Sequence, residues 1–312
     1  MPALVIGFIV HKLIHVADCV REQMAMSTTT NTIQPPSRIR LLFEARVLHE
    51  LASFAGARPF LNIAPRGDGH SVLVLPGLMA NDASTQLLRG FLQGHGYDVH
   101  GWGLGRNFGL RPNLEGQMLD RLGELRRRSG RKVSLIGWSL GGIYARQLAK
   151  QRGDDVRLVI TLGSPFAGSP RATNAWRIYE MASGQSVDEP HSAGPLHETP
   201  PVPTTAIFSR SDGICAWQCC IENEGPQVEN IEVNSSHCGL GHHPAVVYAI
   251  ADRLAQPEGE WKPFRRPQSS KLIYPDAASS STRGVSGPSR PATPRSGHWS
   301  THLLFWLTRR AR

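Results

Sequence analysis

The sequence predicts a three-layer α/β/α sandwich built on a mostly parallel central sheet. Short apolar, β-branched runs alternate with longer helical patterns from Ser71 to Leu254, and parallel strands joined by crossover helices give this pattern. Glycine and proline residues that favour turns separate the runs. The chain of 312 residues is long enough for one such domain and additional segments.

The expected elements follow in chain order. Strands are expected at the short apolar runs 71–75, 97–102, 133–136, 157–162, 204–208 and 230–233. Helices are expected at 84–93, 114–129, 140–151 and 244–254. Asn113 is expected to cap the second helix, Gly130 to follow its end, and Pro244 to occupy the first turn of the last helix. In such a sheet, ligands bind at the carboxyl ends of the strands.

The composition divides the chain into three parts. Residues 1–36 are an N-terminal extension ending in a polar linker, and residues 37–263 are the predicted α/β domain. Residues 264–312 are a basic tail rich in serine, proline and arginine, a composition that predicts disorder. The apolar run Ala3–Val10 in the extension is too short to span a bilayer.

The domain is expected to begin with a helix outside the alternating pattern. Ser37 is a suitable N-cap residue, and the helix would end near Gly56. It carries several leucines on one side, namely Leu41, Leu42, Leu48 and Leu51. We expect this helix to lean on the main domain.

The positive charge of the chain lies mainly in its tail. The net charge is +9, and the segment from Phe264 to Arg312 contains nine basic residues and one acidic residue, which leaves +1 for the rest. A nearly neutral domain argues against specific binding of nucleic acid. The tail is suited to a weak contact with an anionic membrane surface or with RNA, and a solvated, disordered tail without a partner is the simpler interpretation.

The cysteines do not predict a disulfide framework. There are five, an odd number at low density: Cys19, Cys215, Cys219, Cys220 and Cys238. Four of them lie near a histidine, so a zinc site is an alternative. However, the vicinal pair Cys219-Cys220 has no matching CxxC pair, and we expect buried thiols and no metal.

The segment Gly137-Trp138-Ser139-Leu140-Gly141 contains the pattern G-x-S-x-G. An apolar strand precedes it and a helix follows it, so the glycines would let the two approach across a sharp turn with Ser139 at its apex. The positive end of the helix would then face a developing oxyanion. The alternatives are a glycine-rich turn with an incidental serine, or a phosphate-binding loop, for which the expected lysine is absent.

A nucleophilic serine needs a base, and the base needs an acid, in the chain order Ser, Asp or Glu, His. Asp212 and His237 each follow an expected strand at the correct edge of the sheet. The rival histidines His242 and His243 lie nearer the start of the last helix. Among the rival acids, Asp154 and Asp155 lie at the opposite edge and Asp188 lies in an irregular insertion.

Stabilising an oxyanion takes two backbone N–H groups. One is expected from Leu140, the residue after the nucleophile, and the other from the loop after an early strand. In that loop Gly77 allows close approach, and Leu78 is the favoured donor with Met79 as the alternative.

Five segments in order carry a family resemblance. They are Leu-Pro-Gly-Leu at 75–78, Gly-Trp-Gly-Leu-Gly at 101–105, Gly-Trp-Ser-Leu-Gly-Gly at 137–142, Ser-Arg-Ser-Asp-Gly at 209–213, and Ser-His-Cys-Gly-Leu-Gly at 236–241. Over about residues 70–263 the chain resembles the α/β-hydrolase superfamily, and within it the bacterial esterase/lipase-like branch related to PGAP1-type lipid-ester hydrolases. The resemblance implies the triad Ser139, Asp212 and His237, with Leu78 and Leu140 as oxyanion donors. Many lipases have His-Gly where this chain has Pro76-Gly77.

Residues 168–203 lie between two core strands and are expected to form a small cap over the site. They include Trp176, Ile178, Tyr179 and Met181, followed by irregular sequence rich in proline and histidine. These apolar side chains suit an acyl pocket, and a purely structural insertion fits the same sequence.

The expected function is hydrolysis of a carboxylic ester, lipid-like or with a small acyl group, through an acyl-enzyme intermediate. The alternatives are an acyltransferase or thioesterase with the same triad, or a non-catalytic binding protein associated with a membrane through residues 303–307. The expected partner is the ester substrate, and no cofactor is expected. We expect a cytoplasmic location, with membrane association as the alternative.

Overall fold

The computed structural model describes residues 33–188, 194–266 and 273–275, and these contain one six-stranded sheet. The strands are β1 (Ser71–Leu75), β2 (Asp98–Gly101), β3 (Val133–Trp138), β4 (Val156–Leu162), β5 (Thr204–Phe208) and β6 (Val228–Glu232). Their order is β2-β1-β3-β4-β5-β6, and every neighbouring pair is parallel. The carboxyl ends of all six strands therefore meet at one edge.

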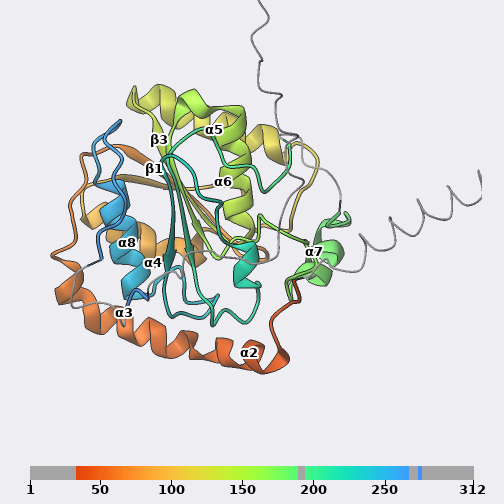
Figure 1. The fold of residues 1–312 in the computed structure, drawn as a ribbon. Coiled ribbons are helices and arrows are strands. Elements are labelled where there is room, and N and C mark those ends of the chain that lie inside the picture. The colour runs from red at the N-terminus through yellow and green to blue at the C-terminus, as the bar shows by residue number, and fades with distance from the viewer. Residues whose placement is uncertain (1–32, 189–193, 267–272, 276–312) are drawn as a thin grey trace, which may run out of the picture. The chain divides into compact units, whose positions relative to one another are not determined.

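Helices cover both faces of the sheet (Figure 1). The helices of the described residues are α2 (Arg38–Leu42), α3 (Val47–Leu61), α4 (Gln86–Gly94), α5 (Leu114–Ser129), α6 (Leu140–Gln151), α7 (Trp176–Ser183) and α8 (Pro244–Leu254). In β1, Val72 and Val74 join a core with α3, α4 and α8, whereas Leu73 and Leu75 join a second core with α5 and α6. Alternate side chains of a strand point to opposite faces, so the predicted three-layer sandwich is confirmed.

From Ser71 onward, the boundaries of the predicted helices and strands lie within two residues of the predictions. The predicted helix at 84–93 begins as a 3-10 turn, Asp82–Thr85, and β3 runs two residues further than predicted, to Trp138. Gly130 ends α5 in the left-handed conformation, with φ 67°. Asn113 precedes α5 but is itself left-handed and forms no side-chain cap, so the predicted capping bond is wrong.

The first helical segment packs against the domain, as expected, but the face that it buries is not the one that carries the leucines. Ser37 caps α2 by accepting a hydrogen bond from the Arg40 N–H, and the helix continues through the 3-10 turn Phe43–Arg46 into α3, past Gly56. The predicted leucines face outward, each at least 41% exposed. The buried positions are Glu44, Glu50, Phe54 and Leu61.

Several predictions concern residues outside the described ranges. The run Ala3–Val10, Cys19, most of the linker and most of the basic tail belong to this group. Phe264 and Tyr274, from the start of the tail, pack edge to face with ring centroids 5.0 Å apart, and the Tyr274 hydroxyl donates to the Ala245 carbonyl at 2.8 Å. No helix in the described ranges has the length and apolar character to cross a membrane.

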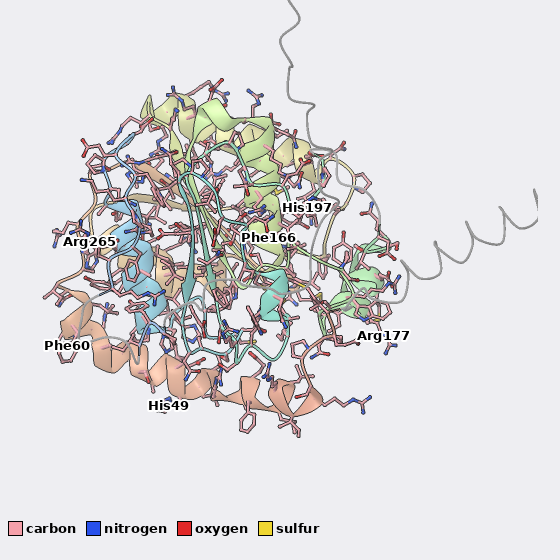
Figure 2. The ribbon with its side chains drawn as sticks, viewed as in Figure 1. His49, Phe60, Phe166, Arg177, His197 and Arg265 are labelled. Atoms are coloured by element: carbon pink, nitrogen blue, oxygen red, sulfur yellow. The ribbon has the colours of Figure 1, made fainter. Side chains whose placement is uncertain are left out.

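Arg146 of α6 forms a buried ion pair and also holds Leu196 and Glu198, in the segment between β4 and β5, to the body of the domain. The side chains of Arg146 in α6 and Glu222 form this pair with no exposure to solvent. Arg146 Nη2 also donates to the carbonyls of Leu196 at 3.1 Å and Glu198 at 2.9 Å. Its guanidinium lies 3.7 Å from the centroid of the Phe166 ring, beside α6 (Figure 2).

We expect Arg146→Met to lower the free energy of unfolding by about 3–5 kcal/mol, because it leaves the Glu222 carboxylate buried without its partner. The double variant Arg146→Met/Glu222→Leu should recover part of this loss, since both charges are then absent. Urea unfolding followed by circular dichroism measures both values. If the double variant instead lost stability equal to the sum of the losses in Arg146→Met and Glu222→Leu alone, the two side chains would act independently and this account would be wrong.

Candidate active site

Ser139 lies at the turn between β3 and α6 in a strained backbone conformation, with φ 53° and ψ −120°. A residue with a Cβ rarely adopts such angles, so the surrounding structure must hold the turn. Three glycines allow the necessary close approach. A Cβ at Gly137 would overlap the backbone of Gly141, and one at Gly141 would overlap the Leu75 carbonyl. A Cβ at Gly142 would overlap the side chain of Ser164.

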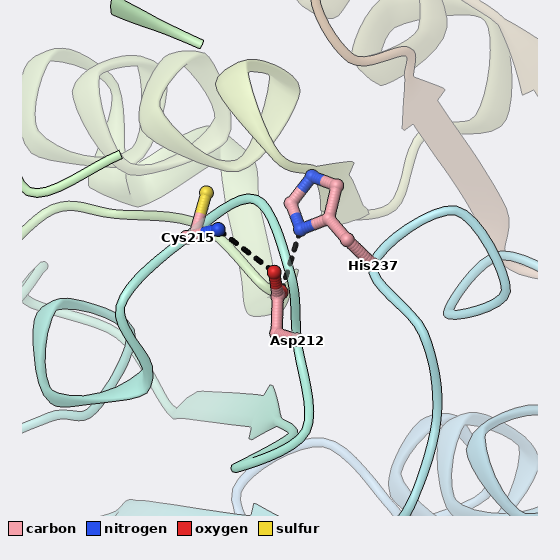
Figure 3. A group of neighbouring side chains, drawn as sticks. All are labelled: Asp212, Cys215 and His237. Atoms are coloured by element: carbon pink, nitrogen blue, oxygen red, sulfur yellow. Dashed lines mark hydrogen bonds and ion pairs between the residues drawn. The ribbon is translucent and has the colours of Figure 1, made fainter. Parts of the chain in front are cut away.

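Asp212 and His237 form a buried hydrogen-bonded pair. His237 Nδ1 lies 2.6 Å from Asp212 Oδ2, and Figure 3 shows the imidazole and the carboxylate facing each other. The second carboxylate oxygen accepts the backbone N–H groups of Ile214 and Cys215, both at 2.7 Å. These contacts fix the carboxylate, which in turn orients the ring with Nε2 away from Asp212.

Two contacts link the Ser139 turn to this pair. The Ser139 N–H donates to the Leu162 carbonyl at 2.8 Å, and a Cβ on the next residue, Gly163, would lie 3.1 Å from His237 Nδ1. The indole N–H of Trp138 donates to the His237 carbonyl at 3.1 Å. Within the described ranges the Ser139 hydroxyl forms no hydrogen bond to His237, and such bonds are often long without substrate.

The rival residues lie elsewhere. His243 caps α8, its ring nitrogen accepting from the Ala245 N–H, and His242 is buried nearby. Asp154 and Asp155 form a turn before β4, at the opposite edge of the sheet. Asp188 pairs with the exposed Arg171 at 2.6 Å. Asp212 and His237 are therefore the acid and the histidine that lie beside the serine turn.

The loop after β1 approaches the serine turn closely. A Cβ at Gly77 would lie 3.3 Å from the Ser139 Cβ, so a side chain here would crowd the serine turn. The Met79 N–H donates to the Asn107 carbonyl at 2.6 Å, which occupies the alternative oxyanion donor. Leu78 and Leu140 both line the cavity that contains Ser139, and the first amides of a helix such as that of Leu140 lack partners within it.

Asn107 was not predicted from the sequence. It is fully buried, its side-chain Nδ2 donates to the Pro76 carbonyl at 2.9 Å, and its own N–H donates to the Ala80 carbonyl at 2.8 Å. It thus organises the loop that carries Leu78. No local pattern marks this asparagine, because its partners lie about 30 residues earlier in the chain.

The cavity beside Ser139 has a volume of about 360 Å³. Its lining is mainly apolar and aromatic: Leu110, Met118, Ile143, Tyr144, Leu148 and Trp176 are among its residues. From the predicted cap, Trp176 and Tyr179 line the cavity, whereas Ile178 and Met181 are exposed. Half of the aromatic and apolar set predicted for this segment therefore faces the site.

Burial and charge act in opposite directions on His237. Burial alone lowers the pKa of this imidazole, but the negative charge of Asp212 and its hydrogen bond to the ring raise it, and the net pKa lies well above the ordinary value. The Cys220 side chain and burial raise the pKa of the Cys215 thiol, so this thiol stays protonated near neutral pH.

Asp212, Cys215 and His237 also form the metal-ligand cluster of the described residues, with one ligand atom of each within 4.8 Å of the others. Zinc would need a thiolate and nitrogen and oxygen ligands at about 2.0–2.2 Å. The protonated thiol and the direct 2.6 Å contact between Asp212 and His237 fit an acid–base pair better than a metal centre. The free cysteines Cys219 and Cys220 are buried.

The carboxylate of Glu44 holds the two loops that carry Asp212 and His237. One oxygen accepts the N–H groups of Gly213 at 2.7 Å and His237 at 3.0 Å, and the other accepts the N–H of Cys238 at 2.9 Å. Glu44 comes from the first helical segment and is 8% exposed. Glu44 thus joins Gly213, the residue after Asp212, to His237.

Glu50, two turns further along the same segment, supports the same region. It accepts the Ser236 N–H at 2.7 Å and is paired with Arg46 at 3.3 Å. Arg46 in turn donates to the Ser211 hydroxyl at 2.7 Å. Sequence reasoning missed both glutamates, since their partners lie more than 160 residues away.

Comparisons with known proteins found similar solved structures but no related sequence. No protein-family model matches the chain, and no characterised protein matches its sequence. Among solved structures, lipase B of Aspergillus fumigatus is 17% identical with a TM-score of 0.47, over 61% of this chain and 53% of the lipase. The chain thus spans about half the length of that lipase.

Two further solved structures are similar. The thioesterase domain from the curacin biosynthetic pathway is 13% identical with a TM-score of 0.40, over 60% of this chain and 92% of the domain. A pyrethroid hydrolase from Sphingobium faniae JZ-2 is 17% identical with a TM-score of 0.43, over 60% of this chain and 98% of that one. Likenesses this distant do not identify the reaction, and the fold rests on the sheet order described above.

We expect Glu44→Gln to lower the free energy of unfolding by about 2–4 kcal/mol, because an amide places a donor against backbone N–H groups and removes a charged acceptor. Glu258→Gln, at the surface ion pair with Lys132, is the matched control and should change stability by less than about 0.5 kcal/mol. Urea unfolding measures both. Equal stability of the Glu44 variant and wild type would contradict the role given to this carboxylate.

Proposed function

We propose that the chain is a serine hydrolase that cleaves a carboxylic ester, with Ser139 as nucleophile, His237 as base and Asp212 as the acid that orients it. One observation carries the proposal: the strained Ser139 turn and the buried Asp212–His237 pair meet at the carboxyl edge of the sheet, beside an apolar cavity. A strained turn of this kind exposes a serine hydroxyl, and a buried carboxylate fixes an imidazole tautomer.

The proposed reaction has two steps. Ser139 Oγ attacks the ester carbonyl carbon while His237 Nε2 takes its proton, and the N–H groups of Leu78 and Leu140 stabilise the oxyanion. The tetrahedral intermediate collapses as His237 gives the proton to the leaving alcohol, which leaves an acyl group on Ser139. Water then attacks the acyl-enzyme with His237 again as base, and the carboxylic acid leaves.

The cavity supports an ester with an apolar acyl group as the substrate. Its walls combine α6 side chains, such as Ile143 and Leu148, with Trp176 of α7, and burial of apolar acyl surface would favour binding. The motif resemblance to esterase- and lipase-like proteins agrees with this class. The steps above use only groups of this chain and water.

Acyl transfer differs from hydrolysis only in the second step, so product analysis distinguishes them. With a competing alcohol such as butanol, a hydrolase releases mainly free acid, and an acyltransferase releases mainly butyl ester. A thioesterase would instead hydrolyse acyl thioesters faster than the matching oxygen esters. Predominant transfer to butanol at low alcohol concentration would overturn hydrolysis as the reaction.

We expect Ser139→Ala to abolish labelling by a fluorophosphonate probe and to lower kcat for p-nitrophenyl butyrate by about a thousandfold or more, because the nucleophile is lost. Ser129→Ala, at the surface end of α5, is the control and should keep full activity. Mass spectrometry locates the probe. Failure of the wild-type protein to be labelled would favour a non-catalytic binding protein, and full activity of the Ser139 variant would reject this serine.

We expect kcat/KM to rise with pH through a midpoint above about 6.5, because only neutral His237 can accept the serine proton and its pKa is raised above that ordinary value. Asp212→Asn removes the charge that raises this pKa, so the midpoint should fall, together with a loss of about 10⁴-fold in kcat. A pH–rate profile and histidine NMR titration give both midpoints. An unchanged His237 titration in the Asn variant would contradict the electrostatic coupling.

A further inference from the structure

The outer face of the first helical segment exposes large apolar side chains. Six of them are 60–79% exposed: Ile39, Leu42, Phe43, Leu48, Phe60 and Ile63. We call these six the outer face. Phe60 and His49 point away from the sheet, along the outside of α3 (Figure 2). Large apolar side chains exposed in this number along one helical segment point to a contact with a partner or a membrane.

The segment reverses the usual pattern of a surface helix. Such helices bury leucines and expose charged residues, whereas here Glu44 and Glu50 are buried against the domain and the leucines face solvent. The glutamates are committed to backbone N–H groups of the Gly213 and Ser236–Cys238 loops. The outer face therefore cannot be buried by rotating the helix without breaking these bonds.

The exposed charges of this segment are all positive. Between Ile33 and Gly67 the only acidic residues are the two buried glutamates, and the exposed basic residues include Arg38, Arg40 and Arg58. Arginines beside leucine, isoleucine and phenylalanine are the composition of helices that lie in the interface of an anionic membrane. Two copies of this face would bring arginines together, which disfavours self-association through it.

We propose that the outer face docks on the surface of an anionic lipid bilayer, with α2 and α3 lying along the interface. A bilayer accepts apolar side chains spread along about 36 Å of helix, from Arg38 to Leu61, without needing a complementary shape. The start of the segment also lies near the cavity, since Asn174, between the lining residues Thr173 and Ala175, donates from Nδ2 to the Pro36 carbonyl at 3.0 Å. Docking would thus place the proposed ester site close to the lipid surface.

The docking does not depend on the proposed hydrolysis. Ser139→Ala should bind vesicles as the wild-type chain does, because Ser139 lies at the carboxyl edge of the sheet and not on the outer face. A wild-type chain that binds vesicles but hydrolyses no ester would therefore contradict only the proposed hydrolysis. A chain that hydrolyses esters but does not bind vesicles would contradict only the docking.

The test is co-sedimentation of the full chain with vesicles of phosphatidylcholine, alone or with about one third phosphatidylglycerol. We expect binding to the anionic vesicles that weakens in 0.5 M salt. Leu48→Asp should lower the apparent partition coefficient about tenfold or more, because it places a carboxylate in the apolar contact. Leu87→Asp, at an exposed leucine of α4, is the matched control and should bind like wild type.

Three results would overturn the proposal. The first is no binding of the wild-type chain to anionic vesicles, and the second is equal binding of Leu48→Asp and wild type. The third is loss of binding only when the tail residues Arg309, Arg310 and Arg312 are changed to serine, which would assign the contact to the tail. Circular dichroism and thermal unfolding confirm that each variant is folded, which is expected because Leu48 is 74% exposed.

Discussion

The carboxylate of Glu44 is the contact on which the geometry of the site depends. Asp212 and His237 follow different strands, and a hydrogen bond between them requires the two loops to keep a fixed separation. Glu44 provides this by accepting N–H groups from both loops at 2.7–3.0 Å. Hydrogen bonds to an ionised group are stronger than neutral ones, and burial shields them from competition with water.

The strained turn at Ser139 is held in a comparable way, by backbone contacts on both sides. Gly137 and Gly141 admit the neighbouring backbone where any side chain would overlap it, and the Ser139 N–H is fixed to Leu162. Strain of about 1–3 kcal/mol persists only where surrounding contacts determine the conformation. Ser139, Asp212 and His237 are thus each held by hydrogen bonds that involve main-chain groups of these or neighbouring segments.

Local patterns predicted the sheet, its helices and the residues at its carboxyl edge. Ser139, Asp212 and His237 could be chosen from the sequence because each follows an apolar strand, and parallel strands end at one edge. The residues that hold these three in place could not be chosen from the sequence. Glu44 and Glu50 act on loops more than 160 residues away, and Asn107 reaches back to Pro76. Periodicity reports which face of an element is apolar, not which distant backbone group it meets.

The exposed leucines of α2 and α3 also show that a local sequence pattern cannot predict which helix face meets the domain. A helix with leucines on one face predicts that this face is buried, and the prediction fails for Leu42 and Leu48 because the glutamates of the opposite face are needed inside. Backbone N–H groups buried without an acceptor would be costly, so satisfying them outweighs burying the leucines against the domain. The helical segment that holds the loops of Asp212 and His237 is therefore also the segment that presents an apolar, positively charged surface to its surroundings.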